Sequence, residues 1–144
     1  MEKGQRFLIT GGFLSFVYLI WRKGVGSINK ACPLPTQDQD LNGENRQRAK
    51  ENFMYGPLNE NAISFWTRIA DYWKIPVAEA QQKRCGNCTA YDQSPRMKKC
   101  MNTKSPEVGY CWMHKFKCAS YRTCNTWAEG GPVKTDKKSY AWQK

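Results

Sequence analysis

Residues 85–132, CGNCTAYDQSPRMKKCMNTKSPEVGYCWMHKFKCASYRTCNTWAEGGP, decide the fold of this chain. No other part of the 144 residues carries comparable chemistry. Sulfur atoms at this density can bind a metal cluster, bind a zinc ion or pair with one another. The stretch contains six of the seven cysteines: Cys85, Cys88, Cys100, Cys111, Cys118 and Cys124.

The composition predicts one domain with extensions and an unusual core. Hydrophobic residues make up 40% of the chain and aromatic residues 13%, whereas Leu, Ile and Val are few. A core built mainly from Trp, Tyr, Phe and Cys is expected to need a metal or a disulfide to stabilise it. The cysteine count is odd, so at least one thiol has no partner within the chain. Cys32 lies far from the others in the sequence and is the expected leftover.

The net charge of +11 is spread over both ends of the chain. A basic surface favours an anionic partner, such as nucleic acid, membrane headgroups or an acidic protein. The simpler interpretation is a lysine-rich surface that keeps the protein in solution. Contact with nucleic acid is supported by no recognised motif.

The strongest helix signal lies in residues 61–84, just before the cysteine-rich stretch. Asn61 is a plausible N-cap, and Pro76 fits the first position of a second short helix, Val77 to about Lys83. The apolar residues of the first helix recur at helical spacing and form one stripe: Ala62, Phe65, Trp66, Ile69, Ala70 and Trp73. This stripe predicts core packing, with the first helix as a lid over the cysteines.

The remaining segments are interpreted as extensions. Residues 1–30 form an apolar arm whose run 7–21 is too short for a standard membrane span. This run is either a membrane anchor, an arm packed on a partner protein, or a signal peptide without a good cleavage site. Residues 31–60 are predicted to be a polar linker. Residues 133–144 form a basic tail without periodicity.

Three kinds of cysteine site are open on the spacing alone. Cys85 and Cys88 form a C-x-x-C, which can place two thiolates on one metal centre. Zinc sites usually repeat such a close pair, and none follows here. A thioredoxin-type dithiol expects a βαβ context that is absent. An iron–sulfur cluster can take thiolates from separate loops, and the interleaved aromatic residues suit its surroundings. His114, the only histidine, is expected to be structural.

The cysteine pattern resembles the high-potential iron–sulfur proteins. The resemblance covers residues 85–132 and is carried by the C-x-x-C at Cys85 and Cys88 and a closing C-x-x-W at Cys124 and Trp127. It implies a [4Fe–4S] cluster bound by Cys85, Cys88, Cys111 and Cys124. In the alternative alignment Cys100 is the third ligand and Cys111 the fourth. The preferred alignment leaves Cys100 and Cys118 as a possible disulfide or as free thiols.

The resemblance also implies a fold and a role. We expect a small, loop-rich α+β fold, with amphipathic helices before a cysteine module (residues 85–132) of short hairpins. Trp127 and Tyr91 would shield the cluster. The arrangement of residues 65–92 and 109–132 also looks like small proteins of tailed bacteriophages, which implies a structural component of a virion that contacts other phage proteins. The alternatives are a membrane-anchored electron carrier and a zinc- or disulfide-stapled interaction module. Since no substrate-pocket signature is present, no enzymatic activity is expected.

Overall fold

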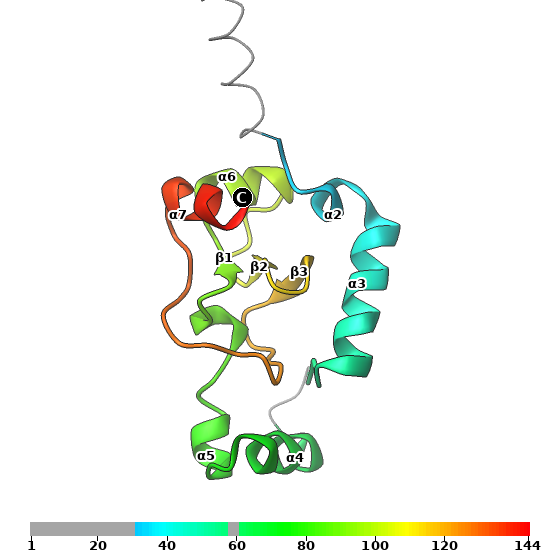
Figure 1. The fold of residues 1–144 in the computed structure, drawn as a ribbon, viewed down its shortest axis with the longest axis vertical. Coiled ribbons are helices and arrows are strands. Elements are labelled where there is room, and N and C mark those ends of the chain that lie inside the picture. Colours follow the sequence, from blue (N-terminus) through cyan, green and yellow to red (C-terminus); the bar gives the residue numbers. More distant parts are fainter. Residues whose placement is uncertain (1–30, 58–60) are drawn as a thin grey trace, which may run out of the picture. The chain divides into compact units, whose positions relative to one another are not determined.

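A computed structural model describes residues 31–57 and 61–144 of the chain. This part is a small α+β fold, as the sequence predicts, with short helices around a three-stranded antiparallel sheet (Figure 1). In the described ranges, no helix is both long and apolar enough to cross a membrane. The apolar run 7–21 and its proposed roles lie outside the described residues.

The sheet lies within the cysteine-rich stretch. Its strands are β1 (Tyr91–Asp92), β2 (Val108–Cys111) and β3 (Phe116–Ala119), in the spatial order β1-β2-β3. β2 and β3 form a hairpin in which Cys111 pairs with Phe116. Lys115 closes the turn with a positive φ of 56°, and its backbone N–H donates to the Cys111 carbonyl at 2.7 Å. The predicted hairpin is therefore confirmed.

The segment predicted to be a polar linker contains two helices, so this expectation is corrected. They are α2 (Leu34–Gln37) and α3 (Gln39–Asn52). The buried face of α3 consists of Asn42, Asn45 and Ala49, spaced as one helical stripe. Asn42 accepts from the Lys117 N–H at 2.7 Å, and Asn45 donates to the Lys115 carbonyl at 2.7 Å. Two polar residues thus hold α3 against the β2–β3 hairpin, which an apolar pattern cannot reveal.

The predicted amphipathic helix is present as α4 (Ile63–Trp73), followed by the short α5 (Val77–Ala80). Both caps lie one residue from their predicted positions, because Ala62 is the N-cap of α4 and Pro76 is the N-cap of α5. The two helices share a core of their own, so α4 packs mainly on α5 and not as a lid over the cysteines. Its link to the cysteine stretch is the Trp73 indole N–H, which donates to the Asn125 carbonyl at 3.1 Å.

A second helix pair and a disulfide complete the fold. α6 (Pro95–Cys100) packs against α7 (Asp136–Trp142), which lies beside it in Figure 1, so the predicted tail ends in a helix. The buried Arg96 joins them by donating to the Ser139 hydroxyl at 3.0 Å. Cys100, at the end of α6, forms a disulfide with Cys32, whose Cα lies 5.4 Å away. Cys32 is therefore not the leftover cysteine, and Cys100 and Cys118 are not a pair.

Candidate metal centre

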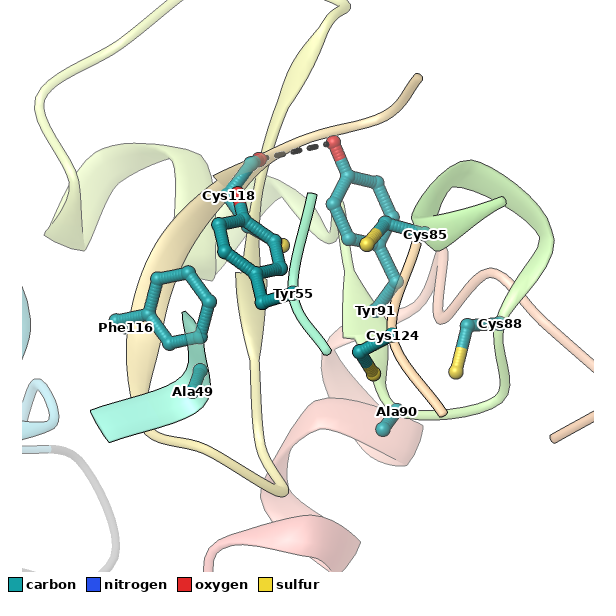
Figure 2. Close-up of a cluster of buried hydrophobic side chains, with 9 residues drawn as sticks. All are labelled: Ala49, Tyr55, Cys85, Cys88, Ala90, Tyr91, Phe116, Cys118 and Cys124. Atoms are coloured by element: carbon teal, nitrogen blue, oxygen red, sulfur yellow. Dashed lines mark hydrogen bonds between the residues drawn. The ribbon is translucent and has the colours of Figure 1, made fainter. Parts of the chain in front are cut away.

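Five free cysteines line one cavity at the centre of the cysteine-rich stretch. The cavity is small, with a volume of about 10 Å³, which is room for about one water molecule. Figure 2 shows four of these cysteines with Tyr91, which also lines the cavity. Thr126 provides the one side-chain hydroxyl of the lining apart from that of Tyr91, and the rest is sulfur, methyl and aromatic surface. The five cysteines, defined here as the thiol cluster, are Cys85, Cys88, Cys111, Cys118 and Cys124.

Backbone hydrogen bonds fix the C-x-x-C against the segment that follows β3. Residues Cys85–Asn87 form a short 3₁₀ turn, η1, closed by the Cys88 N–H donating to the Cys85 carbonyl at 2.9 Å. The Cys85 N–H donates to the Arg122 carbonyl at 2.6 Å, and the Gly86 N–H donates to the Ser120 carbonyl at 2.8 Å. The turn therefore holds both of its thiols close to the chain that leads from Cys118 to Cys124.

Hydrogen bonds of the Asn87 and Trp127 side chains also stabilise the η1 turn. The Asn87 carboxamide oxygen accepts from the Arg84 N–H at 3.0 Å and from the Trp127 indole at 2.8 Å. Trp127 lines the cavity and follows Cys124 by three residues. The predicted shielding residues, Trp127 and Tyr91, thus both lie at the thiol cluster.

Two glycines allow the chain to close around the cavity. A Cβ atom on Gly109 would lie 2.4 Å from the Tyr91 ring. The Tyr91 ring can therefore pack against β2 at this position only because residue 109 has no side chain. A Cβ atom on Gly131 would lie 1.7 Å from the Cys88 carbonyl oxygen. Because real Cβ contacts are much longer, both positions require glycine.

Hydrogen-bonding groups contact two of the sulfurs. The His114 backbone N–H donates to the Cys111 sulfur at 3.5 Å. The Thr126 hydroxyl lies 3.1 Å from the Cys124 sulfur, and the His114 ring nitrogen Nε2 lies 2.7 Å from the same hydroxyl. His114 also stacks on Phe53 with ring centroids 4.4 Å apart. His114 therefore lies beside the thiols of Cys111 and Cys124 and packs against Phe53.

Burial raises the pKa of three of the thiols, Cys111, Cys118 and Cys124, in the metal-free chain. It raises the pKa of Cys111, and the nearby Cys124 thiol adds to the effect. It raises the pKa of Cys124 to about 11, and hydrogen bonding from Thr126 partly offsets this. A hydrogen bond to the Cys85 side chain raises the pKa of Cys118, and burial raises it further. A metal that binds here must displace these protons.

The four predicted ligands lie together, and the alternative alignment fails. Cys85, Cys88, Cys111 and Cys124 all line the cavity, from η1, the end of β2 and the loop after β3. Cys100 is bound in the disulfide to Cys32, so it is not the third ligand in this structure. Cys118 is a free thiol, one of the two alternatives that the sequence left open, but its place in the cavity was not predicted. It lies on the same buried face of β3 as Phe116.

Within the described ranges, no three His, Cys, Asp or Glu side chains are placed so that they could hold a metal ion as they stand. Comparisons with protein-family models, with curated proteins and with solved structures found no match for this chain.

Proposed function

We propose that this protein binds an iron–sulfur cluster, a [4Fe–4S] cubane, in the thiol-lined cavity. Its ligands are Cys85, Cys88, Cys111 and Cys124. The observation that carries the proposal is the convergence of these four unpaired, largely buried cysteines on one cavity from three separate segments. A cubane takes four thiolates, and these commonly come from separate loops.

The chemistry of the lining supports a cluster. Four thiolates with no cation beside them would be costly to bury, and the lining contains no Lys or Arg side chain. The irons of a bound cluster would supply the positive charge and undergo one-electron redox chemistry. This chain would contribute the sulfurs, the exclusion of water by Trp127 and Tyr91, and hydrogen bonds to sulfur from His114 and Thr126.

Five cysteines from separate segments line the cavity, and a cluster can take its thiolates from separate loops. Zinc, the alternative, takes four ligands at about 2.3 Å from one point for sulfur. Either group would require the thiols to move, inward onto a single ion for zinc and outward around a cluster for iron and sulfide, because the cavity volume is about 10 Å³.

We extend the proposal to the role of the cluster. It stabilises this chain as a structural component of a larger assembly, in line with the resemblance to phage proteins. The competing role is electron transfer.

Single substitutions test the ligand set. Cys124→Ser in the full chain, purified without oxygen, is expected to lose the brown colour and the bound iron. Cys118→Ser is the matched variant, because it removes a neighbouring buried thiol that the proposal does not use as a ligand. It is expected to retain iron. Equal loss of iron in both variants would show that the assignment of ligands is wrong.

The role is tested separately. A structural cluster predicts that iron stays bound without a reversible one-electron couple in an accessible range, and that the protein co-purifies with a multi-protein particle. A reversible couple in voltammetry, with exchange to a soluble acceptor, would instead favour the electron carrier.

A further inference from the structure

A second cavity, with a volume of about 410 Å³, lies between helix α3 and the turn that joins β2 to β3. This volume is in the range of small-molecule sites. Two residues of its lining, Arg48 and Lys115, are exposed, so the cavity opens to solvent. We infer that it is a binding site for a small phosphate monoester with a flat apolar part, such as a nucleoside monophosphate. The inference goes beyond the proposed function, because none of the cysteines that the structure describes lines this cavity.

Two structural elements form the walls of the cavity. The wall on α3 consists of residues that recur at helical spacing: Asn45, Arg48, Ala49 and Phe53. The other wall is the hairpin turn, residues 113–115. The Asn45 side chain donates to the Lys115 carbonyl at 2.7 Å, and Figure 1 shows α3 beside β3. The two walls are therefore fixed relative to each other before a ligand binds.

Arg48 and Lys115 give the cavity a positive charge that nothing in the lining neutralises. Within the described ranges, neither side chain makes an ion pair, and no carboxylate lines the cavity. Of the acidic residues near Arg48 on α3, Glu44 is exposed and outside the lining. Glu51 accepts a hydrogen bond from Gln47 at 2.8 Å.

Two cations match the charge of a phosphate monoester better than that of a carboxylate. The monoester has a charge of about −1.5 to −2 at neutral pH, whereas a carboxylate has a single charge. The guanidinium group of Arg48 can donate to two phosphate oxygens at once, and the ammonium group of Lys115 can bind phosphate as a point charge. A phosphate group between these two side chains would therefore use both charges.

The rest of the lining presents apolar and aromatic surface to a ligand. The rings of Phe53 and His114 pack with their centroids 4.4 Å apart. Thr126 holds the His114 ring, because its hydroxyl lies 2.7 Å from Nε2. Ala49 and Met113 add further apolar surface. A flat ring on the ligand can pack against this surface, whereas an inorganic phosphate ion would leave it in contact with water.

Isothermal titration calorimetry of the full chain at low ionic strength tests the site with three probes. Adenosine 5′-monophosphate has both the charge and the flat ring, adenosine has only the ring, and inorganic phosphate has only the charge. The monophosphate is expected to bind one to one with a dissociation constant below about 1 mM. Adenosine and phosphate should each bind at least about tenfold more weakly.

Four variants with the same loss of charge locate the site. Arg48→Gln and Lys115→Gln should each weaken binding of the monophosphate about tenfold. Arg46→Gln and Lys50→Gln are the matched controls, because both residues are exposed on α3 and lie outside the cavity. The controls should retain the wild-type affinity within about twofold. Thermal unfolding checks that all four variants are folded.

Amide chemical shifts give an independent location for the bound ligand. The monophosphate should change the shifts of residues 45–53 and 113–115, and changes centred elsewhere would overturn the inference. Equal weakening in all four variants would show general attraction to a basic protein and would also overturn it. So would adenosine or phosphate binding as tightly as the monophosphate, or binding to a long polynucleotide without any binding of the monophosphate.

Discussion

The Cys32–Cys100 disulfide gives a prediction whose size follows from the structure. The bond joins residues 68 apart, so it closes a long loop in the unfolded chain. Loop-closure entropy assigns about 3 kcal/mol to a 15-residue loop and about 4.7 kcal/mol to a 100-residue loop, and interpolation gives about 4 kcal/mol here. Cys32→Ser should lower the free energy of unfolding by that amount.

Urea unfolding of the cluster-free chain at neutral pH measures the effect. With a slope of about 2 kcal/mol per molar urea, the midpoint should fall by about 2 M. Cys100→Ser and the double variant should unfold at nearly the same midpoint as Cys32→Ser, because all three lack the same bond. The reduced wild-type chain should behave like them.

Two results would refute the reasoning. A loss of less than about 1 kcal/mol in Cys32→Ser would mean that the bond does not close this loop in the protein. Loss of iron in Cys100→Ser, with iron retained in Cys32→Ser, would return Cys100 to the ligand set. The account expects iron in both variants.

Three further substitutions and one titration probe other parts of the fold. Gly131→Ala should destabilise the chain by about 3 kcal/mol or more, because the new Cβ atom would collide with the Cys88 carbonyl. Gly43→Ala should stabilise helix α3 by about 1 kcal/mol, because no atom lies within 4 Å of the new Cβ atom. Thermal unfolding of the two variants measures both effects. Asn45→Ala should cost about 1–2 kcal/mol in urea unfolding, since the Lys115 carbonyl loses its partner. The raised pKa of Cys124, about 11 against an ordinary 9.0, means that the cluster-free chain should lose stability as pH rises between these values. Cys124 should contribute roughly 3 kcal/mol to this loss, beside the contributions of Cys111 and Cys118, and Cys124→Ala should lack that share; an unchanged alkaline profile in the variant would contradict the prediction.

Helix α4 and the β2–β3 hairpin could be predicted from the sequence because their signals are local. The stripe that includes Trp66 and Ile69 recurs at helical spacing, and both residues are fully buried in the structure. Helix α3 could not be predicted in this way. Its buried face contains Asn42 and Asn45, whose value depends on hydrogen bonds to Lys117 and Lys115 some 70 residues away. Long-range polar contacts leave no hydrophobic periodicity.

The candidate site shows the same division. The C-x-x-C and the closing Cys124 stand out by spacing, and the structure brings both together with Cys111. The pairing of Cys32 with Cys100 depends on α6 and the chain before α2 meeting in space, which spacing cannot specify. The position of Cys118 follows from the alternation along β3. That signal becomes usable once the strand and its buried face are known.

The most direct test of the central claim is the metal and acid-labile sulfide content of the full-length chain, purified without oxygen. The account predicts about four irons and about four sulfides per chain, with a broad visible absorbance. A colourless chain that contains one zinc per molecule, or one that contains no metal and has five titratable thiols, would contradict it.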